Sequence, residues 1–177
     1  METTIQLLSV LVLISQIALA IGVLILLFRY KLLINDLVIA QANKAIFFIA
    51  LMSTGGSLFF SQIANFAPCE LCWFQRIFMY PLVFLFGVAI LKKEDKIRAY
   101  ATPLVFVGWL YAAYHNYIYY EGTMNAVCSI NSHVSCIVPY FTKFGFITIP
   151  VMSLTAFTLI GFILIICRLN DKMKNKR

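Results

Sequence analysis

The segment at 68–76, Pro-Cys-Glu-Leu-Cys-Trp-Phe-Gln-Arg, holds Cys69 and Cys72 in the Cys-x-x-Cys spacing of a redox dithiol. It opens a long apolar run, and Pro68 suits the start of a helix because the first turn does not need its missing N–H. A thiolate there is stabilised by unpaired backbone N–H groups and the helix dipole, whereas the negative charge of Glu70 opposes this effect. We therefore expect thiol–disulfide chemistry at this helix end, beside a small-molecule electron acceptor.

A second pair, Cys128 and Cys136, has seven residues between its members in a polar stretch. Two pairs in one compartment permit exchange, in which a thiolate attacks a disulfide through a mixed disulfide. We expect electrons to pass from this pair to the helix-end pair. The alternatives are a static staple in the loop, or tetrahedral zinc bound by all four cysteines, which an oxidising compartment disfavours. Four cysteines allow three connectivities, and the sequence does not choose among them.

Two further polar residues are expected near the dithiol. Positions 69, 72 and 76 share one face of a helix, which places Arg76 about 6 Å deeper than Cys72. A charge at that depth is costly, so the side chain must snorkel, pair or contact a functional group. His115 lies in a later apolar run at a similar expected depth. Both could contact a polar ligand such as a quinone head group; the alternatives are an interfacial anchor for Arg76 and a packed, hydrogen-bonded role for His115.

The elements that must position these residues are membrane spans. Of the 177 residues, 62% are hydrophobic and only 12% are charged, which predicts an all-α, polytopic membrane protein. The net charge of +7 does not indicate nucleic-acid binding, because the basic residues lie between apolar runs rather than in one patch. Five charge-poor runs predict five spans, at roughly 5–28, 45–66, 72–91, 99–120 and 145–167.

The distribution of basic residues predicts the orientation. All Lys and Arg residues except Arg76 and Lys143 lie between spans one and two, between spans three and four, or after span five. The positive-inside rule then places the N-terminus outside and the C-terminus in the cytoplasm, so that the loop 121–144 and Cys69 share the outer side. The first run lacks a basic n-region, and we expect a retained helix rather than a signal peptide. Cys167, at the inner end of span five, is expected to be a small apolar residue of its helix.

With these features in place, the segment 68–76 resembles the signature of the DsbB family of bacterial disulfide-forming membrane oxidoreductases, and is most similar to its BdbC-type members from Gram-positive bacteria. A second block at 144–150, Phe-Gly-Phe-Ile-Thr-Ile-Pro, is similar to the start of the last span in that group. The resemblance covers about residues 45–167. It implies a four-helix bundle that oxidises a thioredoxin-fold partner and passes electrons to a membrane quinone.

The resemblance also implies residue roles. Cys69 and Cys72 match the quinone-coupled pair, with Cys72 the cysteine that meets the quinone, and Arg76 matches the quinone-contacting arginine. Cys128 and Cys136 match the loop pair that takes electrons from the partner, with Cys128 the site of the mixed disulfide. His115 matches a histidine at the quinone site.

Together these features predict a four-helix transmembrane bundle at 45–177, with a redox loop at 121–144, preceded at 1–44 by one extra N-terminal transmembrane helix and a cytoplasmic loop. They also predict a multi-pass protein of the bacterial cytoplasmic (inner) membrane that reoxidises a DsbA-like partner and uses ubiquinone or menaquinone. One rival is a vitamin K epoxide reductase-like enzyme, where the dithiol would be expected in a late span. The other is a metal-binding or structural membrane protein with static disulfides.

Overall fold

The computed structural model describes residues 2–33, 36–122, 136 and 140–174, with the side chains of 29–38 left aside, and all its regular elements there are helices. They are α1 (Glu2–Leu33), α2 (Asp36–Leu58), the short π-helix η1 (Phe59–Ile63), α3 (Glu70–Lys92), α4 (Ile97–Glu121) and α6 (Ile149–Lys174).

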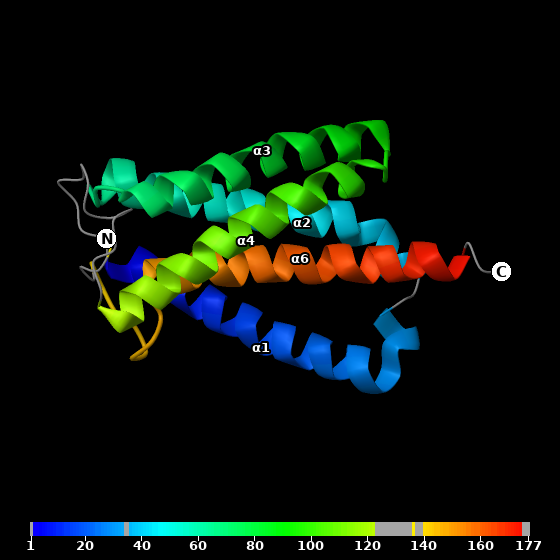
Figure 1. Ribbon diagram of the computed structural model, residues 1–177, viewed down its shortest axis with the longest axis horizontal. Coiled ribbons are helices and arrows are strands. Elements are labelled where there is room, and N and C mark those ends of the chain that lie inside the picture. Colours follow the sequence, from blue (N-terminus) through cyan, green and yellow to red (C-terminus); the bar gives the residue numbers. More distant parts are fainter. Residues whose placement is uncertain (1, 34–35, 123–135, 137–139, 175–177) are drawn as a thin grey trace.

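Four of these helices form a closed bundle. α2 packs on α3, α3 on α4, α4 on α6, and α6 on α2, so that each helix has two neighbours. α1 lies outside this ring and packs on α6 (Figure 1). The prediction of a four-helix bundle with one additional N-terminal helix is therefore confirmed.

Four of the helices are long and apolar enough to cross a membrane, over Glu2–Phe28, Ile39–Ile63, Glu70–Lys92 and Ile149–Lys174. The remaining predicted span, 99–120, forms helix α4, which has 25 residues but does not reach that hydropathy. Its polar residues Arg98, His115 and Asn116 are buried within the bundle, so they lower the mean hydropathy without facing lipid. Mean hydropathy alone therefore understates the ability of α4 to span a membrane, because its buried polar groups are satisfied inside the protein.

Helix boundaries differ from the predicted spans at two places. α1 runs to Leu33 and α2 begins at Asp36, so most of the loop expected at 29–44 is helical. α6 begins at Ile149 rather than at 145, because a turn precedes it. Lys143 and Ile147 exchange two backbone hydrogen bonds there, and Phe144 and Gly145 both adopt positive φ angles. Most of the predicted redox loop 121–144 lies outside the described residues.

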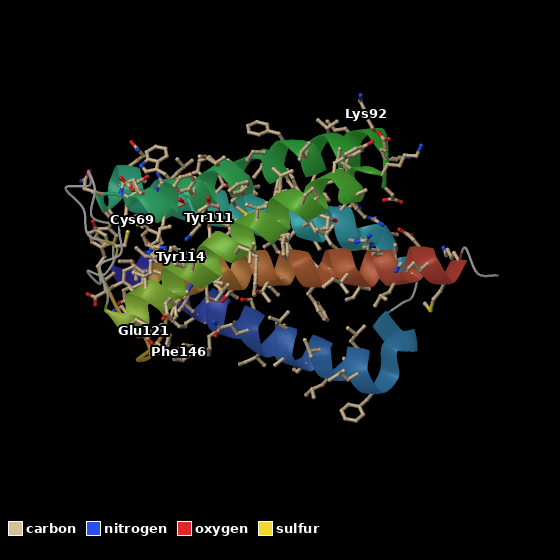
Figure 2. All side chains as sticks on the ribbon, viewed as in Figure 1. Cys69, Lys92, Tyr111, Tyr114, Glu121 and Phe146 are labelled. Carbon is tan, nitrogen blue, oxygen red and sulfur yellow. The ribbon has the colours of Figure 1, made fainter. Side chains whose placement is uncertain are left out.

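The two ends of the bundle can be told apart by their residues. Figure 2 shows Cys69, Glu121 and Phe146 at one end and Lys92 at the other. The chain begins at the cysteine end, where Lys143 Nζ lies 3.3 Å from a carboxylate oxygen of Glu2. The N-terminus and the dithiol therefore share one end of the molecule; the compartment that this end faces remains the prediction made from charge.

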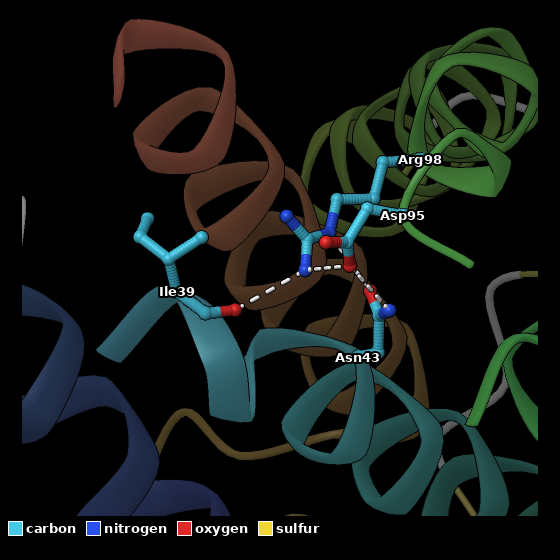
Figure 3. Close-up of polar contacts among 4 residues, drawn as sticks. All are labelled: Ile39, Asn43, Asp95 and Arg98. Atoms are coloured by element: carbon cyan, nitrogen blue, oxygen red, sulfur yellow. Dashed lines mark hydrogen bonds and ion pairs between the residues drawn. The ribbon is translucent and has the colours of Figure 1, made fainter. Parts of the chain in front are cut away.

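A buried arginine ties together the opposite end (Figure 3). Arg98 donates from Nε to Asn43 Oδ1 at 2.8 Å and from Nη2 to the backbone oxygen of Ile39 at 3.1 Å. The same Nη2 contacts Asp95 Oδ1 at 2.6 Å, and Asn43 Nδ2 donates to that oxygen at 3.0 Å. Arg98, expected as a loop charge, thus links α2 to the turn between α3 and α4. A buried charge is tolerated because it is paired and hydrogen-bonded.

A glycine sets the close packing of α4 on α6. A Cβ added at Gly108 would lie 2.3 Å from a ring atom of Phe157, which is fully buried, and 3.0 Å from Cβ of Phe78. Small residues of this kind let helices approach closely in a membrane.

We expect Gly108→Ala to destabilise the protein by about 1–3 kcal/mol, because the buried ring of Phe157 cannot move aside in a packed core. Thermal unfolding in detergent, followed by circular dichroism, measures the effect as a lower Tm. Gly161→Ala on α6 is the matched control, since a Cβ there meets only Val105 at 3.8 Å. An equal Tm for the two variants would contradict the packing assigned to Gly108.

Candidate active site

The dithiol lies at the N-terminus of α3. Cys69 occupies the N-cap position with extended backbone angles, and its carbonyl oxygen accepts the N–H of Trp73 at 3.2 Å. Cys72 follows in the first turn. Both are free thiols, with sulfur atoms 3.1 Å apart. This spacing lets the pair close to a disulfide without rearranging the helix, and it holds both sulfurs where unpaired backbone N–H groups favour a thiolate.

His115 of α4 is buried behind the dithiol, with 2% of its surface exposed. Its Nε2 atom lies 3.8 Å from Cys69 Sγ, and its Nδ1 atom lies 3.0 Å from Gln75 Nε2. An amide nitrogen can only donate, so Nδ1 accepts this hydrogen bond and Nε2 carries the proton that faces Cys69. Gln75 therefore orients the histidine so that its N–H faces the sulfur of Cys69.

These contacts change the acidity of Cys69, which lies just before the membrane-spanning part of α3. The hydrogen bond with the Cys72 thiol lowers the pKa of Cys69 most strongly, burial opposes it, and the hydrogen bond and electrostatic attraction of His115 lower it further. The net result is a pKa well below the ordinary value of a thiol. A thiol with a lowered pKa is ionised at neutral pH, which favours nucleophilic exchange.

Arg76 lies one turn below Cys72 and is held by α2. Its Nε donates to Ser57 Oγ at 2.9 Å, its Nη2 donates to the Ser57 carbonyl oxygen at 3.1 Å, and its guanidinium carbon lies 5.2 Å from the centre of the Trp73 ring. The ion pairs among the described residues are those of Arg98 and Lys143, so Arg76 has no carboxylate partner in that part of the chain. Among the described residues, the site therefore presents a positive charge without a carboxylate partner.

That charge borders a cavity of about 410 Å³. Cys72, Gln75 and Arg76 line it from α3, and its other walls are mostly apolar side chains of α1, α2 and α6. Pockets of this volume, with few polar groups among apolar walls, are typical of small-molecule sites. The combination fits a quinone, whose ring carries two carbonyl oxygens and whose tail is apolar.

Cys69 and His115 do not line this cavity, and both are buried in the protein. The sequence predicts that Arg76 and His115 contact the same head group, and the structure places only Arg76 in the lining of the cavity. Arg76 borders the cavity next to Cys72, whereas His115 contacts Cys69. Cys72 therefore borders the cavity and also packs against the buried cluster that contains Cys69, whereas Cys69 lies in that cluster alone.

Cys136 lies on the Cys69 side. It is disulfide-bonded and buried, and it belongs to one packed cluster with Cys69, Leu71 and Ile118. Cys128 lies outside the described residues. A hydrogen bond connects Tyr140 to the segment before α3, since the Tyr140 hydroxyl donates to the carbonyl oxygen of Ala67 at 2.9 Å. One member of the loop pair is therefore packed beside the buried sulfur of the helix-end pair.

Sequence reasoning missed two residues of this site. Gln75 is assigned no role from the sequence, although a polar residue in an apolar helix, three positions after Cys72, is a signal for a functional side chain. Ser57, which holds Arg76, belongs to the run Ser-Thr-Gly-Gly-Ser at 53–57. Such a run of small residues usually indicates helix packing, and only the structure shows that one hydroxyl binds the arginine.

The reduced site also has the atoms of a metal centre. Ligand atoms of Cys69, Cys72 and His115 all lie within 4.8 Å of one another. Two thiolates and one imidazole suit zinc. The four-cysteine site considered from sequence does not form in this state, because Cys136 is disulfide-bonded.

Comparison with known proteins settles the family. A sequence model described as "Disulfide bond formation protein DsbB" matches residues 40–167, which is most of the chain. The chain belongs to the DsbB family. This agrees with the resemblance of the segment 68–76 and goes against the vitamin K epoxide reductase-like rival. α1 lies before the range that the DsbB family model matches.

Relatives from three bacteria support the assignment. The chain is 41% identical over 141 residues to "Disulfide bond formation protein C" of Bacillus subtilis (strain 168), covering 78% of this chain and 96% of the relative. It is 41% identical over 110 residues to "Probable disulfide formation protein C 1" of Bacillus anthracis, covering 62% and 79%. It is 39% identical over 121 residues to "Probable disulfide formation protein" of Deinococcus radiodurans, covering 63% and 78%. No solved structure shows a significant match.

DsbB-family membership and the apolar helices together make this chain a multi-pass protein of the bacterial cytoplasmic membrane and a disulfide oxidoreductase. The predicted class, membrane location and fold are therefore confirmed.

We expect His115→Leu to raise the pKa of Cys69, because it removes the hydrogen bond and electrostatic attraction that lower that pKa. Thiolate absorbance near 240 nm, titrated in a Cys72→Ser background, measures the change. The Cys69→Ser/Cys72→Ser variant supplies the baseline. Ionisation of Cys69 should occur below the ordinary thiol pKa of about 8.5 when His115 is present and move upward in His115→Leu. Identical titrations would contradict the role given to His115.

Proposed function

We propose that this DsbB-family protein reoxidises a reduced thioredoxin-fold, DsbA-like partner and uses a membrane quinone, ubiquinone or menaquinone, as the electron acceptor. The observation that carries the proposal is the position of the dithiol between the cavity and Cys136. Cys72 borders the cavity with Arg76 and also packs against the cluster of Cys69 and Cys136, whereas Cys69 does not line the cavity. A redox pair placed in this way can receive electrons on one side and release them on the other.

In the proposed exchange, a partner thiolate attacks Cys128 of the loop disulfide, forms a mixed disulfide and releases the thiolate of Cys136. The second thiolate of the partner resolves this mixed disulfide, and the loop pair leaves reduced while the partner leaves oxidised. Cys136 then attacks Cys69 of an oxidised Cys69–Cys72 pair and releases Cys72 as a thiolate. Cys128 then attacks Cys136 of the Cys136–Cys69 disulfide, which closes the loop disulfide and releases Cys69 as a thiolate. Both electrons now reside on the helix-end pair. Packing of Cys136 beside Cys69 supports this order.

The residues around the dithiol would assist each part of this exchange. The Nε2–H of His115 stabilises the thiolate of Cys69 when Cys69 is the leaving group. Arg76 would attract the thiolate of Cys72 and donate a hydrogen bond to an oxygen of a bound ring. Apolar walls would exclude water from the sulfur of Cys72. A quinone held there would accept two electrons and two protons, which returns Cys69 and Cys72 to the disulfide.

The decisive experiment measures quinone reduction by purified protein supplied with a reduced thioredoxin-like partner and either a ubiquinone or a menaquinone analogue. We expect turnover with the unmodified protein and none with Cys72→Ser. Cys167→Ser is the matched control, because Cys167 is buried in a separate cluster with Ile39 and Ile166. Undiminished turnover in Cys72→Ser would end the proposal. About one zinc per chain in anaerobically purified protein, lost in His115→Leu, would instead favour the metal-binding alternative.

A second prediction tests the cavity without touching a polar group. Gly56 lines the cavity and a Cβ there meets nothing within 4 Å, so Gly56→Leu should fill space without disturbing helix packing. We expect the KM for the quinone analogue to rise about tenfold, since overfilling a site costs roughly 1–3 kcal/mol.

Gly55→Leu is the control for this variant. Gly55 is the preceding residue, it is exposed, and it also has open space around its Cβ position, but it does not line the cavity. The KM for the thioredoxin-like partner should stay the same in both variants. Equal KM values for quinone in the two variants would show that the cavity is not the site of electron release.

A further inference from the structure

α1 is the element to which neither the family nor the proposed chemistry gives a role. It lies before the matched range 40–167 and outside the four-helix ring. Four of its residues nevertheless line the cavity next to Cys72, namely Leu8, Leu11, Val12 and Ser15. Their spacing of i, i+3, i+4 and i+7 places them on one face of the helix. One continuous stripe of α1 therefore faces the same space as Arg76.

The position of this stripe is fixed by polar contacts at two levels. At the cysteine end, the carboxylate of Glu2 pairs with Lys143 at 3.3 Å. Further down, Gln16 Nε2 donates to Thr155 Oγ1 of α6 at 3.0 Å, and Thr155 itself lines the cavity. A side chain–side chain hydrogen bond between apolar helices in a membrane fixes both register and rotation. Between Glu2 and Gln16, α1 thus presents the same face to the cavity.

The stripe begins at about the depth of Arg76 and continues deeper along the bundle. Leu8 to Ser15 lie about 9–20 Å along the helix from Glu2, while Arg76 lies about 9 Å along α3 from Glu70, at the same end of the bundle. The α1 side offers three aliphatic side chains and one hydroxyl, whereas the α3 side offers a thiol, an amide, a guanidinium and a phenol in addition to the side chain of Met79. The two walls of the cavity therefore differ in chemistry at the level where a ligand would lie.

We propose that α1 forms the apolar wall of the quinone site and contacts the isoprenoid tail of the bound quinone through Leu8, Leu11 and Val12. This proposal rests on the proposed function. A head group with carbonyl oxygens suits the guanidinium side, and an aliphatic chain suits the α1 side, where burial of each CH₂ stabilises the complex. α1 then helps to decide which quinones bind, because the shape of its stripe limits the space beside the dithiol.

Photolabelling tests the contact directly. Purified full-length protein is irradiated with a quinone analogue that carries a photoactivatable group on its tail, and labelled peptides are mapped by mass spectrometry. We expect labelling within residues 8–15 that excess unlabelled quinone abolishes. Competable labelling confined to α2, α3 and α6 would overturn the role of α1, while the quinone site itself would stand.

A matched pair of substitutions on α1 supplies a second readout. Val12 lines the cavity, whereas Val10 is an exposed valine two positions away that does not. We expect Val12→Trp to raise the Kd of the quinone analogue, measured by equilibrium binding, about tenfold. Val10→Trp should leave that Kd unchanged. Equal Kd values for the two variants would overturn the assignment of α1 as a wall.

These outcomes are separable from failure of the proposed function. If the unmodified protein neither reduces quinone nor shows competable labelling anywhere, the quinone proposal fails and the role of α1 fails with it. If turnover depends on Cys72 while labelling and Kd do not depend on α1, only the inference about α1 is wrong.

Discussion

The structure depends on the way in which the first turn of α3 separates two neighbouring sulfur atoms. Cys69 and Cys72 have sulfurs only 3.1 Å apart, yet one is buried against His115 and the other borders a cavity. The arrangement arises at the helix start, because Cys69 is the N-cap residue with extended backbone angles and Cys72 lies in the first turn of α3. The pair can therefore stand between two surroundings, a packed protein cluster that contains Cys136 and an apolar space that contains Arg76.

The rest of the bundle holds this helix end in place. At the far end, Arg98 ties α2 to the turn between α3 and α4, and in the middle Gly108 brings α4 close to α6. α4 can then carry His115 to the sulfur of Cys69, and α2 can carry Ser57 to Arg76. The polar contacts that shape the site thus connect helices, while apolar packing supplies the bundle. A polar group between helices in a membrane has few alternative partners, which makes such contacts specific.

Much of this could be predicted from the sequence. Long charge-poor runs predicted the helices, and the Cys-x-x-Cys motif after Pro68 predicted a dithiol at a helix end, because both signals are local. The burial of Arg98, the Gln75–His115 hydrogen bond and the attachment of α1 to the cavity were not predictable in this way. Each depends on which helix faces which, and helical periodicity is weak where nearly every residue is apolar. For the same reason the contact of His115 with Cys69 was not predictable from the sequence.

Trapping a disulfide between the two cysteine pairs tests the account most directly. In a Cys72→Ser/Cys128→Ser variant, one cysteine of each pair remains, and the account predicts that mild oxidation joins Cys69 to Cys136. Mass spectrometry of peptides digested without reduction would detect this bond, with Cys167 as an internal thiol that stays free. Recovery of Cys69 and Cys136 as free thiols under oxidation would contradict the claim that the pairs can exchange.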